Sequence, residues 1–71
     1  MSVFPNPTHD QIRVLANGRA EIRIYDLAAR RILERQFTNG VSIDVTELPA
    51  GLYLYELMRD GTVMKGKFIR E

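Results

Sequence analysis

The sequence contains no cysteine and no tryptophan among its 71 residues. The absence of cysteine excludes a disulfide framework, a thiolate zinc site and a thiol nucleophile. A chain of this length has room for one domain at most, near the lower size at which proteins fold without disulfides or metals. Hydrophobic residues make up 45% of it, far too many for an intrinsically disordered chain. The composition therefore predicts one small globular domain.

An excess of charge of either sign is also missing. Lys and Arg number 10 and Asp and Glu number 9, so the formal net charge is +1. This balance gives no electrostatic basis for binding nucleic acid or an anionic membrane. No run approaches the roughly 20 apolar residues that cross a bilayer, so we expect no membrane insertion. The first residues, Met1–Pro5, lack the basic and apolar regions of a signal peptide, and any export signal is expected outside this sequence.

Motifs that carry chemistry are scarce as well. The sequence has no phosphate-binding glycine loop, no His-Glu-x-x-His pattern and no EF-hand spacing. His9 is the only histidine, and no Cys or Ser lies at a spacing typical of a catalytic or metal site. We therefore interpret it as a surface turn residue. The carboxylates of four residues form no readable pair: Asp26, Asp44, Glu47 and Asp60. We therefore predict a protein that is not an enzyme, with no catalytic residue and no cofactor. Calcium held by turn oxygens stays open, although no loop presents the spaced ligands that calcium requires.

What the sequence does have is alternation of polar and apolar residues, interrupted by turn signals. Arg19–Ile24 and Val41–Thr46 alternate as half-buried strands should. Glycine follows asparagine or aspartate at Asn17-Gly18, Asn39-Gly40 and Asp60-Gly61, the dipeptides favoured in type I′ hairpin turns. Leu48–Gly51 fits a type I turn, with proline second and glycine fourth. These signals predict an antiparallel, all-β chain.

Two layers are expected rather than one, because a single sheet would leave an apolar face in water. We predict a small Ig-like antiparallel β-sandwich of about six or seven short strands. The expected core is the set of apolar side chains that the alternation turns inward: Ile12, Val14, Ile22, Ile24, Leu33, Phe37, Val41, Ile43, Val45, Tyr53, Tyr55, Leu57, Val63, Phe68 and Ile69. Open sheet edges also predict a weak homodimer.

Two residue groups suit either a partner or a merely structural role. The basic pairs Arg30-Arg31 and Lys65-Gly66-Lys67 are interpreted first as a solvated rim, because isolated pairs steer partners only weakly. Tyr53 and Tyr55 share one face of a strand, and such pairs belong more often to a core than to a platform for sugars or bases.

Four blocks together resemble a known family. Val3–Pro7 reads VFPNP and is similar to the YPNP opening of the type A C-terminal sorting domains of the type IX secretion system. Ile22–Leu27 resembles the v-x-i-y-d strand of that family, and Ile43–Tyr53 its ldls-x-l-x-x-G-x-Y segment. Lys65–Arg70 resembles its basic and apolar final strand. The blocks occur in the family's order and spacing over essentially the whole chain.

One position departs from the family pattern. The family usually has glycine before the basic residues that follow the Tyr25-Asp26 strand, whereas this sequence has Ala29 there. A non-glycine residue in the left-handed conformation costs roughly 1–2 kcal/mol. We therefore expect either a differently built turn or a strained one.

The resemblance implies a folded secretion signal. Residues 1–71 would form a single C-terminal sorting domain, excised from a larger cargo protein of a Gram-negative bacterium. Its implied partners are outer-membrane shuttle and translocon proteins of the type IX system and a sortase-like cysteine peptidase. The cargo would pass through the periplasm to the outer membrane, cell surface or extracellular space. The domain would then be cleaved off, often with attachment of the cargo to the surface.

The resemblance also implies roles for particular residues. Six would fix the fold of the motif: Pro5, Asn6, Pro7, Asp44, Gly51 and Tyr53. The final strand would supply the recognition surface, with Lys65, Lys67 and Arg70 exposed and with Phe68 and Ile69 anchored in the sheet. An alternative function is an accessory β-sandwich module that binds carbohydrate or a cell-surface partner, which requires exposed tyrosine rings; a purely structural cap is a second alternative.

Overall fold

The computed structural model describes all 71 residues and contains five β-strands and no helix. Their bounds are β1 Ser2–Phe4, β2 Gln11–Tyr25, β3 Arg31–Asp44, β4 Gly51–Arg59 and β5 Thr62–Arg70. All four strand pairings are antiparallel. The predicted all-β class is confirmed, but the predicted count of six or seven strands is wrong. No helix is long and apolar enough to cross a membrane.

The strand count differs because two predicted turns are corners within continuous strands. Gly18 and Asn39 have positive φ angles of 92° and 70°, as their sequence suggests, yet the chain does not reverse there. Instead the pairing of β2 with β3 shifts register between Leu15 and Arg19, and the Gly18 N–H donates to the Asn39 Oδ1 at 3.0 Å. Both strands bend together at this point. Two long bent strands thus replace the expected four short ones.

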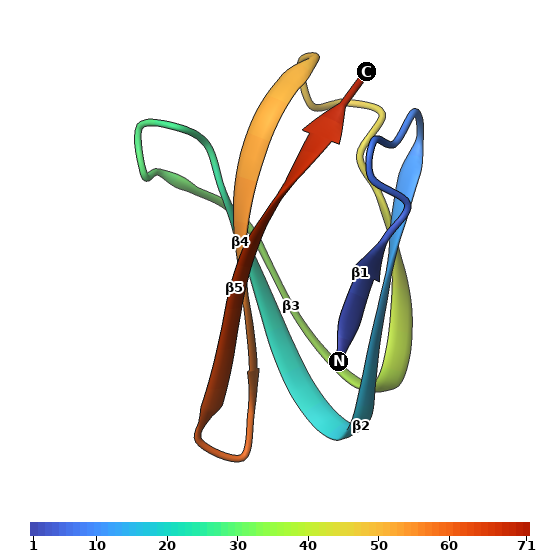
Figure 1. Cartoon of the computed structure of the whole chain (residues 1–71), viewed down its shortest axis with the longest axis vertical. Helices are drawn as coiled ribbons and strands as arrows, with labels where there is room; N and C mark the ends of the chain where they lie inside the picture. The colour runs from blue at the N-terminus through green and yellow to red at the C-terminus, as the bar shows by residue number, and fades with distance from the viewer.

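The bend divides one sheet into two facing layers (Figure 1). β2 is the central strand: its first half pairs with β1 and its second half with β4, while β3 follows its other side throughout. β5 pairs with β4 and completes the sheet. The expected two layers are therefore the halves of a single curled sheet.

The true hairpins lie elsewhere. Asp60 and Gly61 have φ angles of 50° and 79° and join β4 to β5, so the predicted turn there is confirmed. β2 and β3 are joined at Asp26–Arg30, where Ala29 has a φ of 64°. Between β3 and β4 the hydrogen-bonded turn is Val45–Leu48, just before the predicted Leu48–Gly51.

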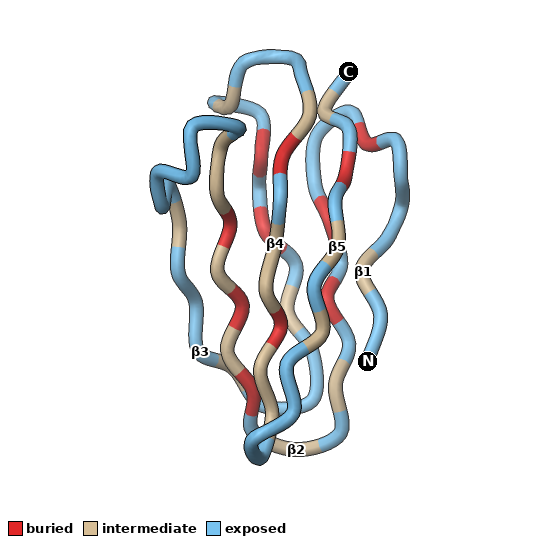
Figure 2. Tube along the Cα trace, turned by 60° about the vertical axis from the view of Figure 1, so that its left-hand side comes forward, coloured by how far each residue is buried: buried red, intermediate tan, exposed pale blue.

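The core lies between the two layers, where buried residues alternate with exposed ones (Figure 2). Ten hydrophobic residues are buried: Ile12, Val14, Ala20, Ile22, Ile24, Ile43, Val45, Tyr53, Leu57 and Phe68. Leu33, Phe37, Val41 and Tyr55 are half-buried and pack against them. The core prediction is wrong for Val63 and Ile69, which are 51% and 46% exposed, and it omitted Ala20. Both mispredicted residues lie on the outer face of β5, as its alternation with Phe68 requires.

Candidate functional site

The final strand, β5, lies at one end of the sheet and shows two different faces. Its outer face carries Val63, Lys65, Lys67 and Ile69, all exposed. The register with β4 is continuous from Gly51 opposite Arg70 to Arg59 opposite Thr62. The strand therefore presents alternate side chains to solvent without a bulge.

The outer face of β5 combines lysines with apolar neighbours on β4. Lys67 lies opposite Leu54, and Ile69 lies opposite Leu52. Lys65 pairs with Glu56 through Nζ and Oε2 at 3.7 Å, and the other oxygen of Glu56 accepts a hydrogen bond from the Tyr25 hydroxyl at 2.7 Å. That hydrogen bond, with partial burial, raises the pKa of Tyr25. The surface is thus basic at its rim and partly apolar within.

The inner face of β5 joins the core through Phe68, which is 1% exposed. The Phe68 ring stacks on Tyr53 with the centroids 5.5 Å apart and the planes at 21°. The Tyr53 hydroxyl donates to the carbonyl of Pro49, four residues upstream, an arrangement similar to the tyrosine corner of Ig-type sandwiches. Since Tyr53 is only 6% exposed, its ring offers no platform for a sugar. Tyr55 lies across Gly66, where any Cβ atom would collide with its ring.

Arg70 ends the strand and holds the loop after β3. Its Nε donates to the Val45 carbonyl at 2.9 Å and its Nη2 donates to the Thr46 carbonyl at 3.0 Å, so the side chain is half-buried and occupied. Asp44 shapes the same loop: its Oδ1 accepts from the Thr46 hydroxyl at 2.6 Å and from the Thr46 N–H at 2.8 Å. These hydrogen bonds lower the pKa of Asp44. Of the residues expected to be exposed for recognition, Lys65 and Lys67 are, and Arg70 is turned to this internal role.

The segment after β1 covers the C-terminal half of the β5 edge. The Asn6 Oδ1 accepts from the Ile69 N–H at 3.0 Å, and the Asn6 Nδ2 donates to the Lys67 carbonyl at 3.2 Å. The Thr8 N–H donates to the Ile69 carbonyl and the Glu71 N–H donates to the Thr8 carbonyl, both at 2.8 Å. We name Asn6–Thr8 the clasp. Pro5 and Pro7, whose preceding peptide bonds are both cis, frame the turn that brings the clasp from one layer to the other.

Thr8 is a structural residue that sequence reasoning missed. It is the only buried residue outside the hydrophobic core, and its hydroxyl donates to the Gln11 carbonyl. The signal available in the sequence was a β-branched polar residue directly after Pro7, where a tightly turned chain needs a local hydrogen bond. Gly51, in contrast, is a residue that was expected from the sequence to fix the fold. It begins β4, lies opposite Arg70 and has a φ of 152°, in the region that favours glycine.

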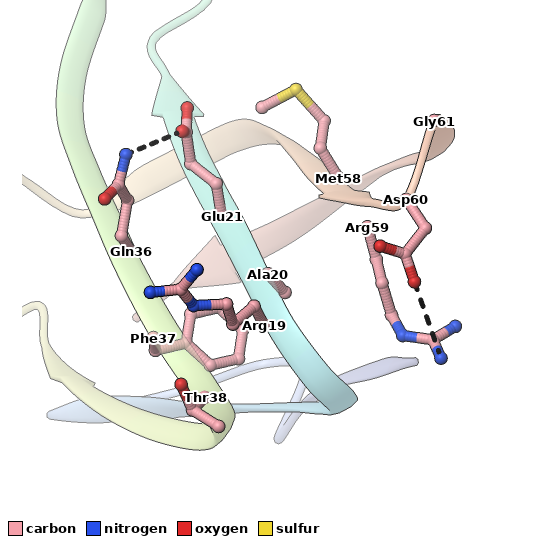
Figure 3. Close-up of a pocket in the computed structure, with 10 residues that line it drawn as sticks. All are labelled: Arg19, Ala20, Glu21, Gln36, Phe37, Thr38, Met58, Arg59, Asp60 and Gly61. Carbon is pink, nitrogen blue, oxygen red and sulfur yellow. Dashed lines mark hydrogen bonds and ion pairs between the residues drawn. The ribbon is translucent and has the colours of Figure 1, made fainter.

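The largest hollow is an open groove of about 510 Å³ at the other end of the molecule, between the β2–β3 corner and the β4–β5 turn (Figure 3). Four of its polar side chains are paired with one another. The Gln36 Nε2 donates to the Glu21 Oε1 at 3.4 Å, and Arg59 lies 3.9 Å from the Asp60 carboxylate. No group of three or more His, Asp or Glu side chains gathers as a metal site. His9 is exposed, with Nε2 3.2 Å from the Glu71 carboxylate.

Comparison with known proteins identifies the family of this chain. The family model described as "Secretion system C-terminal sorting domain" matches residues 2–71. The chain belongs to this family, the C-terminal sorting domains of the type IX secretion system. No curated protein matches the sequence. As a sorting domain of this system, the chain is a C-terminal secretion signal that serves export to the cell surface or the extracellular space, and its family is generally non-catalytic.

Proposed function

We propose that this sorting domain is a non-catalytic, folded secretion signal at the C-terminus of a larger cargo protein. Outer-membrane shuttle and translocon proteins would bind it during export from the periplasm. A sortase-like cysteine peptidase would then remove it, often while attaching the cargo to the cell surface. The family match over residues 2–71 is the observation that carries this proposal.

The outer face of β5 is the recognition surface in this proposal. Lys65, Lys67 and Ile69 are exposed on it, while Phe68 fastens the strand to the core from the other side. The clasp and Arg70 hold the C-terminal end of the strand in place. Six residues are interpreted as fixing the fold that holds this surface in place, without contacting the secretion machinery themselves: Pro5, Asn6, Pro7, Asp44, Gly51 and Tyr53.

A periplasmic reporter fused to the N-terminus of residues 1–71 tests the proposal in a host that has the type IX system. The reporter is expected outside the cell and separated from the domain. An intact fusion that stays in the periplasm contradicts the proposal.

The recognition surface needs a point substitution rather than deletion of β5, because deletion removes Phe68 and with it part of the core. Ile69→Ser should reduce export while the domain stays folded. Leu27→Ser is the matched control, since Leu27 is an exposed aliphatic residue in the β2–β3 turn. Equal export of both variants would remove Ile69 from the recognition surface.

A further inference from the structure

We propose that the uncovered half of the β5 edge, Val63–Lys67, binds an extended segment of the secretion machinery with alternating acidic and apolar residues. The segment would add to the sheet as a further antiparallel or parallel strand beside β5. This inference rests on the proposed function and names the chemistry of the partner at the same strand.

The backbone of β5 is the first argument. The clasp bonds to the Lys67 carbonyl and to both backbone groups of Ile69, so odd-numbered residues direct these groups away from β4. Because hydrogen-bonding direction alternates along a strand, Val63, Lys65 and the Lys67 N–H point outward too. No strand lies on that side of β5, and the clasp does not reach those residues. A ready template for strand addition is left open.

Charge on the outer face defines the partner further. Lys65 and Lys67 both project there, and their exposed side chains flank the open backbone. Lys65 has one distant carboxylate partner, Glu56 at 3.7 Å, and Lys67 has none. An added strand places its own side chains directly beside these lysines, where opposite charges attract and like charges repel. Carboxylates at alternate positions of the partner fit this face.

On the inner face of the same stretch, the partner segment is expected to place apolar side chains. Met64 and Gly66 are half-buried there, and Met64 packs against the core at the rim of the sheet. Side chains between the partner's carboxylates would point to this face and cover Met64. On the outer side, a shallow hollow of about 450 Å³ beside Lys65 is lined in part by Tyr25 and Leu54. It gives room for one larger side chain of the partner.

The other open edge, along β3, is less suited to strand addition. Arg35 lies opposite the buried Ile22, so its charge is on the inner face between Leu33 and Phe37. A charge turned inward at an edge opposes further pairing. The corner at Asn39 also breaks the β3 edge, whereas β5 keeps one register throughout.

Titration of the isotope-labelled chain with a synthetic peptide, acetyl-EVEVE-amide, tests the inference by nuclear magnetic resonance. We expect the largest amide shifts at Val63, Lys65 and Lys67, with slower hydrogen exchange there. The basic peptide acetyl-KVKVK-amide should give neither. Equal effects of the two peptides, or stronger effects along β3, would overturn the inference.

Charge reversal then tests the same edge during export. Lys65→Glu with Lys67→Glu should lower export of the fused reporter at least roughly tenfold, since like charges would face each other across the new strand pair. Arg31→Glu with Arg35→Glu is the matched control on β3, because each pair contains one side chain with a carboxylate partner and one without. That control should be exported normally.

The outcomes separate this inference from the proposed function. Normal export of the Lys65→Glu, Lys67→Glu fusion overturns the inference and leaves the sorting role intact, whereas failure of the unsubstituted fusion contradicts the sorting role itself. The thermal unfolding midpoint of each variant shows whether folding is preserved. If charge reversal lowers the midpoint, Lys65→Gln with Lys67→Gln replaces it, and unchanged binding of acetyl-EVEVE-amide to that variant overturns the inference.

Discussion

Ala29 occupies a backbone conformation that suits glycine. Its φ of 64° lies in the left-handed region, in the turn that joins β2 to β3. The turn is held by Asp26, whose Oδ1 accepts from the Ala28 N–H at 2.9 Å and from the Arg30 N–H at 3.0 Å. The sequence left a different turn and a strained turn as alternatives. The strained one is present, stabilised by these hydrogen bonds.

Replacing Ala29 by glycine should therefore stabilise the domain. We expect Ala29→Gly to raise the free energy of unfolding by about 1 kcal/mol, because glycine adopts positive φ without steric cost. Urea denaturation measures the change. Ala28→Gly is the control, since Ala28 does not have a positive φ and should gain nothing. A loss of stability in Ala29→Gly would contradict the strain.

Two carboxylates should make the fold sensitive to acid. The pKa of Asp26 is lowered mainly by the hydrogen bond from the Arg30 N–H, and that of Asp44 mainly by the Thr46 hydroxyl. A carboxyl whose pKa is lower in the folded state adds stability above its unfolded pKa, near 3.8, and loses it as the pH falls through the folded value.

Removing these charges should flatten the acid side of the stability profile. Asp44→Asn and Asp26→Asn are each expected to weaken the fall in melting temperature between about pH 5 and about pH 2. Asp10→Asn is the control, because the Asp10 side chain has no ion pair or hydrogen bond. Profiles as steep as that of the unsubstituted domain would show that neither charge matters.

At the scale of elements, the clasp substitutes for a strand beside the end of β5. Asn6 presents its side-chain amide to the strand as a backbone peptide would, accepting from Ile69 and donating to Lys67. Thr8 continues the contact through its own backbone. This explains how a motif near the start of the chain can govern the geometry of its last strand.

Loss of the Asn6 side chain should loosen that end of β5. Asn6→Ala is expected to lower the free energy of unfolding by about 1–2 kcal/mol, since two hydrogen bonds are lost at a partly solvated edge. Hydrogen exchange at the Ile69 amide should quicken at the same time. Asn17→Ala, at an exposed asparagine without a side-chain hydrogen bond, is the control. Unchanged exchange at Ile69 would argue against the clasp.

Sequence patterns predicted some elements well and others poorly, for physical reasons. Alternation predicted four of the five buried residues of β2, all except Ala20, because one face of a half-buried strand must be apolar. The Asn-Gly pairs predicted positive φ at both of their residues, but only Gly18 and Asn39 have it. That preference is local and serves a reversing turn or a strand corner equally well. Which of the two forms at Gly18 depends on the partner strand, through the Asn39 side chain.

In the candidate site, too, features set by local sequence could be predicted and features set by distant contacts could not. Exposure of Lys65 and Lys67 follows from alternation along β5, but the inward turn of Arg70 depends on the loop after β3, which lies far away in sequence. The clasp likewise joins residues separated by most of the chain. Contacts of this kind depend on the folded topology, and local patterns carry no signal for them.

At the scale of the whole molecule, the single curled sheet leaves β5 as an edge strand whose two halves differ in how far their backbone is covered. The C-terminal half of β5 is fixed by the clasp and Arg70, while its first half keeps open backbone groups between exposed lysines. A sorting domain needs a stable body and an accessible surface, and this arrangement supplies both on one strand.

The most direct test of the sorting role is the location of a reporter fused to residues 1–71, measured in a host with the type IX system and in the same host lacking its translocon. The account predicts reporter outside the first host and retained in the periplasm of the second. Equal retention in both hosts, with the domain folded and still attached, would contradict it.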